Sequence, residues 1–144
     1  MPATVATQHY QTVLALDTRG KALYRFTNLV QDVVKTSGVT TGLCTVFVRH
    51  TSASLIIQEN ADPDVLADLE TFFSKLVPEG AFYAHSTEGP DDMPAHIRSV
   101  LTHTSEHIPI MNGRLALGTW QGLYLWEHRH RGSRREVVVH VSGH

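Results

Sequence analysis

The stretch GLCTVFVRHTSASLIIQENADPDVLADLETFFSKL, residues 42–76, decides the fold class because it predicts two strands followed by a helix. Gly42–His50 is rich in Val, Phe and Thr and predicts a strand that is buried on both faces or nearly so, and Ser54–Glu59 predicts a second strand. Asp62 and Pro63 predict a helix start, because aspartate accepts hydrogen bonds from free amides and proline at the first helical position loses none. Apolar residues at helical spacing predict the stripe that packs this helix on the core: Leu66, Leu69, Phe72, Phe73 and Leu76.

The segments on either side add more strands and two further helices. Tyr10–Leu16 predicts a first strand, and a helix is predicted from a cap at Thr27 to a stop at Gly38. Asp91-Asp92 predicts the start of a third helix that runs to about Leu101. The remaining expected strands are Glu106–Ile110, Leu115–Leu117 and a hairpin pair made of Leu123–Arg129 and Glu136–Val141. Strands interspersed with about three helices favour an α+β fold over a βαβ winding, in one domain over residues 1–144.

Composition excludes several classes of protein. Of the 144 residues, 42% are hydrophobic and 18% are charged, which excludes intrinsic disorder. No stretch approaches the roughly 18 apolar residues of a membrane helix. The start Met1-Pro2-Ala3-Thr4-Val5 has no signal-peptide pattern, so we expect a cytoplasmic protein. A single cysteine, Cys44, excludes a disulfide framework, and 12 basic against 14 acidic residues predict no nucleic-acid or membrane partner.

Histidine is unusually frequent, at 10 of 144 residues, and it is the side chain best suited to metal ligation and to proton transfer near neutral pH. His50 stands at the end of a predicted strand beside the hydroxyls of Thr51, Ser52 and Ser54. This arrangement can hold a phosphate or orient a ligand. A buried histidine capped by a neighbouring hydroxyl fits the same pattern, and both interpretations stay open.

The segment His85–His96 brings three carboxylates and two histidines within twelve residues. If Asp92 caps the predicted helix, His96 lies one turn further along, near the same face. Carboxylates and imidazoles placed together can bind a divalent ion or carry out acid–base chemistry. Capping explains one of Asp91 and Asp92 and leaves Glu88 and both histidines unexplained, so we predict a functional site here.

Two further polar stretches follow. Gly118-Thr119-Trp120-Gln121-Gly122 suits a tight loop whose backbone approaches a ligand, with Trp120 as a stacking surface. A structural turn with a core tryptophan is the alternative. In Glu127-His128-Arg129, a strand places His128 opposite to its two neighbours, so only one side of the strand lines a given pocket unless it bends.

Two patterns are misleading. His103-Thr104-Ser105-Glu106-His107 matches the H-x-x-E-H order of a zinc peptidase family, but Pro109 disfavours the helix that this motif needs, and we reject it. A basic set (Arg129, Arg131, Arg134 and Arg135) lacks interleaved aromatic residues. We interpret this set as a solvated hairpin tip, with phosphate capture by one arginine left open.

Taken in order over nearly the whole chain, these stretches resemble the YjbQ family: His50–Leu55, Glu59–Asp64, Glu88–Ile97 and Leu117–Gly122, followed by Glu127–Arg129. The resemblance implies a β-sandwich-like sheet core and a homotrimer whose pockets lie between subunits. It also implies a polar, histidine-rich site that takes a metal ion or an anion. Proteins similar to this one are named secondary thiamine-phosphate synthases, because members substitute weakly for the enzyme that makes thiamine phosphate.

The motif match carries the site residues over to this sequence. We expect catalytic roles for His50, Asp92 and Glu127. The expected substrate-binding set is Thr51, Ser52, Ser54, Asn60, Glu88, Asp91, Gly118, Thr119, Trp120, Gln121 and Arg129. A divalent ion is expected on His85, His96 and His128, with His50 able to replace any of them. Imidazole ligands favour Zn²⁺, and Mg²⁺ is the alternative with a phosphate substrate.

Two positions depart from the family pattern. Ala84 stands where relatives often have arginine, which weakens one phosphate contact, and Trp126 stands where many have cysteine, which argues against a cysteine-dependent reaction. The reaction that the resemblance implies joins a pyrimidine pyrophosphate to a thiazole phosphate and releases pyrophosphate. The alternative is a trimeric metal- or metabolite-binding protein, or a hydrolase. The expected partners are further copies of the chain and a phosphorylated small molecule or anion.

Overall fold

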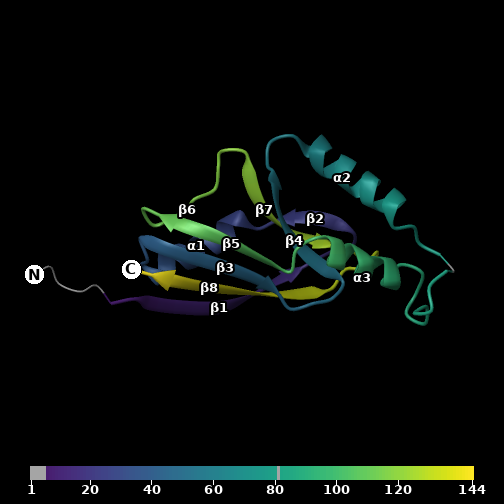
Figure 1. Cartoon of the computed structure of the whole chain (residues 1–144), viewed down its shortest axis with the longest axis horizontal. Helices are drawn as coiled ribbons and strands as arrows, with labels where there is room; N and C mark the ends of the chain where they lie inside the picture. Colours follow the sequence, from purple (N-terminus) through teal and green to yellow (C-terminus); the bar gives the residue numbers. More distant parts are fainter. Residues whose placement is uncertain (1–5, 81) are drawn as a thin grey trace, which may run out of the picture.

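Eight strands and three helices make up the described part of the chain, residues 6–80 and 82–144 of a computed structural model. In chain order they are β1 (Gln8–Asp17), β2 (Ala22–Arg25), α1 (Thr27–Ser37), β3 (Thr41–Val48), β4 (Ala53–Glu59), α2 (Pro63–Leu76), α3 (Asp92–Leu101), β5 (Ser105–Met111), β6 (Arg114–Leu115), β7 (Gln121–Glu127) and β8 (Arg134–Gly143), arranged as in Figure 1. No helix in these residues is long and apolar enough to cross a membrane. Met1–Val5, the stretch without a signal-peptide pattern, lies outside the described residues.

Two antiparallel sheets enclose the hydrophobic core. The larger sheet has the strand order β1-β8-β3-β5-β6 and the smaller sheet the order β2-β7-β4. One cluster of buried side chains draws on both sheets and on α1, with Val46 from the larger sheet, Leu125 from the smaller sheet and Val30 from the helix among its members. The structure therefore confirms the α+β class, three helices and a sandwich-like sheet core.

Helix α1 covers the end of this core. Its buried residues are Val30, Val33 and Val34. The expected cap at Thr27 is wrong, because Phe26 occupies the cap position and no side chain caps the helix. The Thr27 hydroxyl oxygen instead accepts a 2.9 Å hydrogen bond from the backbone N–H of Leu123, which ties the helix start to β7. Gly38 ends the helix with a left-handed φ of 73°, as predicted.

Strand β7 is buried on both faces, as is the first part of its neighbour β4, residues 53–56. Leu123 and Leu125 point into the core between the sheets, and Tyr124 and Trp126 point toward α2. The sequence placed this double burial on β3 instead. There Cys44, Val46 and Val48 are buried, but Leu43 is 41% and Phe47 is 45% exposed, because nothing in the described chain covers the outer face of the larger sheet.

Cys44 lies in the core, as expected. Its side chain is completely buried between the sheets. Burial raises the pKa of the Cys44 thiol to about 12. A thiol in this environment stays protonated, so it offers no thiolate for chemistry.

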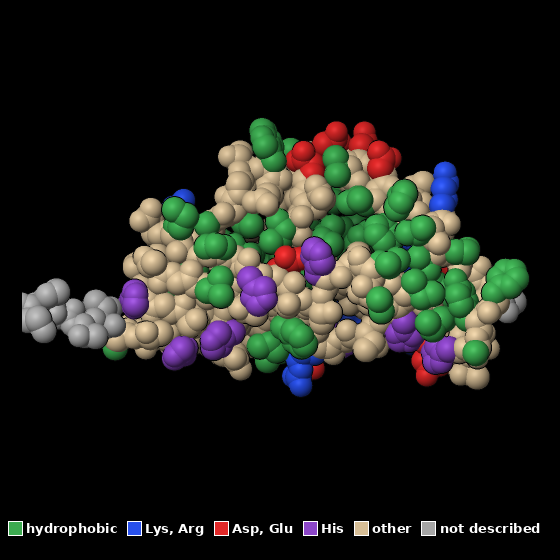
Figure 2. Space-filling model, in the orientation of Figure 1, with side chains coloured by type: hydrophobic (Ala, Val, Ile, Leu, Met, Phe, Trp, Pro, Cys, Tyr) green, Lys and Arg blue, Asp and Glu red, His purple; other side chains and the backbone are tan. Residues whose placement is uncertain are grey.

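Helix α2 lies over the smaller sheet. It begins at Pro63, and the Asp62 carboxylate accepts a 2.9 Å hydrogen bond from the backbone N–H of Asp64, as the sequence predicted. The helix packs on the second hydrophobic cluster through Leu66, Leu69 and Phe73. Only part of the expected apolar stripe packs on the sheet. No α2 residue is buried, and Phe72 and Leu76 are 60% and 54% exposed. Figure 2 shows hydrophobic side chains open to the surface beneath this helix.

The expected hairpin between the last two long strands is wrong. β7 pairs with β2 and β4, whereas β8 pairs with β1 and β3 in the other sheet. The turn over residues 128–133 therefore crosses from one sheet to the other. Gly132 allows this crossing, because a Cβ atom there would lie 2.0 Å from the backbone oxygen of Thr18. The other predicted strands and the third helix are found, with small shifts at their ends.

Candidate functional site

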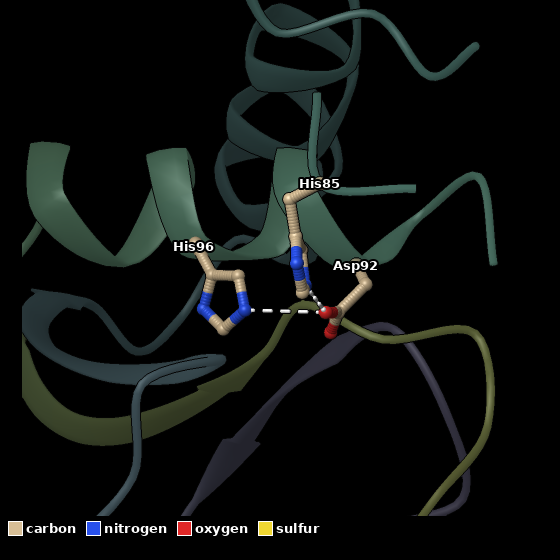
Figure 3. Close-up of side chains that lie close together, drawn as sticks. All are labelled: His85, Asp92 and His96. Atoms are coloured by element: carbon tan, nitrogen blue, oxygen red, sulfur yellow. Dashed lines mark hydrogen bonds and ion pairs between the residues drawn. The ribbon is translucent and has the colours of Figure 1, made fainter. Parts of the chain in front are cut away.

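Three side chains at the start of α3 form a compact group of possible metal ligands. His96 and Asp92 lie one turn apart on α3, and His85 reaches them from the loop that precedes the helix (Figure 3). One ligand atom of each residue lies within 4.8 Å of the others. Asp92 Oδ2 is 2.5 Å from His85 Nε2 and 3.2 Å from His96 Nε2. We call these three residues the α3 cluster.

The hydrogen bonds of His96 determine which ring nitrogen faces the Asp92 carboxylate. His96 Nδ1 lies 2.8 Å from the backbone oxygen of Thr51 and donates to it, because a carbonyl only accepts. In a neutral ring, Nε2 then carries a lone pair, and this lone pair faces the Asp92 carboxylate. Two acceptors do not bond to each other, so a proton or a metal ion is needed between the ring and Asp92.

Asp92 is held in its charged form. Its side chain is almost fully buried, and Arg129 Nη1 donates a 2.6 Å hydrogen bond to the carboxylate oxygen that the histidines do not use. Burial by itself raises the pKa of Asp92, but the hydrogen bond from His85 and the charges of Arg129 and His96 outweigh it and lower the pKa. The carboxylate thus bridges the two histidines and a fixed arginine.

Asp91 does not cap the helix. It stands at the cap position, but its side chain makes no capping hydrogen bond. Its carboxylate instead accepts from Arg129 Nε at 3.1 Å and from the backbone N–H of His130 at 2.9 Å. Burial tends to raise the pKa of Asp91, and these two donors lower it. The capping alternative is wrong, and Asp91 positions Arg129 and the β7–β8 turn.

His128 lies apart from the α3 cluster. It is 1% exposed, and both ring nitrogens have partners: Nδ1 accepts from Arg98 Nε at 3.1 Å, and Nε2 lies 2.8 Å from the Ser54 hydroxyl. Burial first, then the charge of Arg98, lowers the pKa of His128 to about 2. The structure therefore places Asp92, not His128, with His85 and His96.

The close approach of Ser54 and His128 does not make a nucleophile with its base. Because Nδ1 accepts from Arg98, the proton of the neutral ring sits on Nε2, which donates to the Ser54 oxygen. A general base needs the opposite tautomer. The Thr102 hydroxyl donates to the backbone oxygen of Arg98 at 2.7 Å, so the Ser54 hydroxyl donates to Thr102 Oγ1, 2.6 Å away. Ser54 is thus part of a buried hydrogen-bond network.

Glu127 is likewise closed to ligands. It is 0% exposed and forms an ion pair with Arg135, which is 6% exposed, while Thr18 donates a 2.6 Å hydrogen bond to it. This environment leaves Glu127 no contact with a bound molecule within one chain. Arg135 was expected on a solvated tip and is buried instead, because it follows the inward face of β8.

His50 lies beside the α3 cluster rather than in it. Its Nε2 accepts a 2.8 Å hydrogen bond from the backbone N–H of Glu136, which leaves Nδ1 as the N–H side of the neutral ring. Burial and the charge of Arg135 lower the pKa of His50. The ring shares a groove of about 260 Å³ with Thr51 and His96. A ligand in this groove can touch both imidazoles.

The glycine–tryptophan loop lies far from the α3 cluster. Asn60 binds it with its side-chain amide, which donates to the backbone oxygens of Thr119 and Gln121. This loop leads into the start of β7 and lies beside the end of β4, whereas Ser54 and Glu127 lie at the other ends of these strands. Seven residues at about 3.3 Å each separate the two ends by about 20 Å. Trp120 is 64% exposed, so the alternative of a core tryptophan is wrong.

Sequence reasoning missed Arg98 and Glu70 and assigned Arg135 to the wrong environment. Arg98 is buried with its guanidinium 5.2 Å from the Trp126 ring centre, and Glu70 accepts from Arg98 at 2.6 Å. No short motif marks these residues. Arg135 was detectable, because the period of two places it on the same strand face as Val137 and Val139, which are buried. The rejection of the H-x-x-E-H motif is confirmed, because residues 105–111 form β5.

Fold and site together define a small α+β protein with two facing antiparallel sheets and a histidine–carboxylate cluster at the start of its third helix. The family model described as UPF0047 protein YjbQ-like matches residues 12–144, and the chain belongs to this YjbQ/UPF0047 family. It is 70% identical over 137 residues to the UPF0047 protein sll1880 of Synechocystis, covering 94% of this chain and 93% of the relative. It is 44% identical over 137 residues to the UPF0047 protein YjbQ of Salmonella typhimurium, covering 93% and 98%.

Solved structures agree with this assignment. A crystal structure of a YjbQ/UPF0047 protein from Clostridium acetobutylicum matches with a TM-score of 0.83 and 40% identity, over 89% of this chain and 97% of the other. A YbjQ-like protein of unknown function from Sulfolobus solfataricus matches with a TM-score of 0.89 over 96% and 100%. At 24% identity the second match supports the fold alone.

Proposed function

We propose that the protein binds a divalent metal ion, Zn²⁺ first, at His85, Asp92 and His96, and presents the open side of the ion to a phosphorylated small molecule. The observation that carries the proposal is the geometry of the α3 cluster. Three potential ligand atoms lie within 4.8 Å of one another, and the lone pair of His96 Nε2 faces a carboxylate. A divalent cation between these atoms would take the place of the proton that His96 Nε2 otherwise needs in order to face the Asp92 carboxylate.

The donor set fits zinc better than magnesium. Two imidazoles and one carboxylate are a ligand set of zinc sites that keep a fourth position open for water or substrate. Mg²⁺ prefers oxygen ligands and retains several waters. His85 is the most exposed of the three residues, so the loop that carries it can adjust when an ion enters. Asp92 also bonds to Arg129, which fixes the carboxylate from behind.

The finer proposal is a transferase that resembles thiamine-phosphate synthases. It joins a pyrimidine carried on pyrophosphate to a thiazole phosphate, and pyrophosphate leaves. The metal would neutralise charge on the leaving group. Support comes from the family resemblance and from His50, which shares a groove with His96 and keeps an N–H on Nδ1 for a substrate oxygen. We also propose a cytoplasmic location.

A homotrimer is part of the same proposal. The Trp120 loop and the α3 cluster lie at opposite ends of the small sheet, so one chain does not join them. Exposed apolar residues on α2, Phe72 and Leu76, offer a surface for another copy. A second subunit would bring its Trp120 loop to the site. Light scattering is expected to report three times the 16.0 kDa chain mass, and a monomer at micromolar concentration would contradict the shared site.

Zinc titration into chelator-treated protein at pH 7.5 tests the proposal. We expect one ion per chain, and an affinity at least about 100-fold weaker for His96→Ala. His107→Ala is the matched control, because His107 is an exposed histidine on β5 that bonds to Thr45. Equal affinity for wild type and His96→Ala would overturn the site.

Activity is assayed next. Zinc-loaded protein is given the pyrimidine pyrophosphate and the thiazole phosphate, and pyrophosphate release is measured. The transferase proposal expects turnover that falls in His50→Ala. Zinc binding without turnover would instead support the metal- or metabolite-binding alternative.

A further inference from the structure

We propose that the pocket under the β7–β8 turn is an oxyanion site built on Arg131 and Arg135, and that its occupation is coupled through Arg129 to metal at the α3 cluster. The anion site stands on its own geometry. The coupling rests on the proposed function, because it needs the metal. The ligand class is a phosphate group or another tetrahedral oxyanion.

The pocket has the shape and lining of an anion site. It has a volume of about 460 Å³. Its lining residues are Ser52, Arg129, Arg131, Gly132, Ser133 and Arg135. Three of these six carry a guanidinium group and none carries a carboxylate. Hydroxyl groups and arginines in one concave surface are the donors that bind phosphate oxygens.

Arg135 is prepositioned for a ligand. It is 6% exposed, and its Nε and Nη2 donate to Glu127 and Ser52. No hydrogen bond among residues 6–80 and 82–144 uses its Nη1. Arg135 also lines the pocket. A buried arginine that the fold already holds rigidly loses little conformational entropy when it binds a ligand.

Arg131 supplies the uncompensated charge. The ion pairs within the described chain include Arg129 and Arg135 but not Arg131. The turn that carries Arg131 is held in place, because the backbone N–H of His130 donates to Asp91 and that of Ser133 donates to Thr18. An anion therefore meets a free guanidinium on an ordered turn.

Arg129 connects the two sites. Four hydrogen bonds to Asp91, Asp92 and the backbone oxygen of Glu88 leave one of its five N–H groups for the pocket. In the described chain its charge is balanced by Asp91 and Asp92. A divalent ion on Asp92 Oδ2 would neutralise that carboxylate instead. The positive electrostatic potential that Arg129 produces in the pocket would then increase.

This arrangement makes the two ligands cooperative. If metal strengthens the binding of the anion by some factor, the anion must strengthen the binding of metal by the same factor. Couplings of this kind are typically about 5- to 150-fold in affinity.

The first test uses inorganic phosphate and chelator-treated protein in calorimetry. We expect Arg131→Gln to weaken phosphate binding by about 10-fold or more. Arg134→Gln is the matched control, because Arg134 is an exposed arginine of the same segment that does not line the pocket, and it should change the affinity by less than about 2-fold. No phosphate binding, or equal losses in the two variants, would overturn the anion site.

The second test repeats the titration on zinc-loaded protein freed of excess zinc by gel filtration. We expect phosphate to bind at least 5-fold more tightly than to the metal-free protein, and Arg131→Gln to weaken this binding too. Phosphate that binds equally to both forms, while zinc itself binds, would overturn the coupling. Phosphate that binds through Arg131 while zinc fails to bind would instead overturn the proposed metal site and the coupling, and leave the anion site standing. Tighter phosphate binding that is indifferent to Arg131→Gln would place the anion on the metal alone.

Discussion

Two neighbouring groups of this protein contain the same residue types and differ in whether their histidine nitrogens have complementary hydrogen-bond partners. The α3 cluster has two histidines on a carboxylate, with Arg129 behind it. The buried group beneath it, His128 with Ser54 and Arg98 and Glu127 with Arg135, also combines histidine, carboxylate and arginine. In the buried group both ring nitrogens of His128 have partners and the Glu127–Arg135 ion pair is complete, although Arg98 Nη1 has no hydrogen-bond partner among the described residues. In the α3 cluster the lone pair of His96 faces a carboxylate.

This difference gives a criterion that distinguishes a ligand-binding histidine from a structural one. Residue type did not distinguish His96 from His128, but the partner of each ring nitrogen does. A ring whose nitrogens are both satisfied stabilises the fold, and a ring whose free nitrogen faces another acceptor can take up a proton or a metal ion there. The comparison predicts that substitutions in the buried group lower the free energy of unfolding strongly and that substitutions in the α3 cluster lower it little.

The largest effect is expected for Glu127→Gln. This change leaves Arg135 as a buried charge without its carboxylate, which typically costs about 3–5 kcal/mol of the free energy of unfolding. Urea denaturation measures it. Glu136→Gln is the control, because its ion pair with Arg49 spans 3.7 Å at an exposed position and should contribute less than about 1 kcal/mol. Similar small losses in both variants would show that the buried group is not structural.

The next effect is a pH dependence from His128. Its pKa is about 2 in the folded chain, so below pH 6.5 the unfolded chain takes up a proton there and the folded chain does not. The contribution to stability is complete above pH 6.5 and is lost as the pH falls toward 2. The free energy of unfolding should fall by roughly 1–1.4 kcal/mol between pH 6 and pH 5 from this residue.

The variant His128→Gln should lose the part of the slope that His128 contributes, and His107→Gln should keep the full wild-type slope. The lowered pKa of His50 contributes to the slope in all three proteins. Both are compared with wild type by urea denaturation at pH 6 and pH 5. A slope in His128→Gln that equals the wild-type slope would mean that the His128 ring titrates normally and is not buried as a neutral group.

The smallest effect is expected for His85→Ala. Its ring is half exposed, and ion pairs at such positions typically contribute less than about 1 kcal/mol. Metal-free His85→Ala should therefore unfold at nearly the wild-type temperature. Zinc should raise the melting temperature of wild type and much less that of the variant, because an ion that binds only the folded state stabilises it. A large loss without zinc would assign His85 to the structural group.

The fold was largely predictable from local pattern. The Asp62-Pro63 helix start follows from capping and proline chemistry that act within one turn. The third helix also begins where the sequence placed it, although the Asp91 side chain does not cap it. The sheet partners did not follow, because period-two alternation says which side chains share a face but not which strand lies beside it. For this reason β7 and β8 looked like a hairpin, and the four-residue β2 was missed.

The candidate site was predictable in part. His85, Asp92 and His96 lie within one loop and one helical turn, so sequence spacing alone brings them near one another. The partners of His128 come from α3 and β4, which are distant in the chain, and no spacing rule gives them. Burial of Arg135 depends on the same long-range packing, with the alternation along β8 as its only local sign.

Anomalous diffraction at the zinc edge, from crystals of zinc-loaded protein, tests the central claim most directly. The account predicts one strong peak per chain, about 2.0–2.2 Å from His85 Nε2, His96 Nε2 and an Asp92 oxygen, with His128 still bonded to Ser54 and Arg98. A peak on His128, or on the exposed histidines of the outer sheet face with none at the α3 cluster, would contradict it.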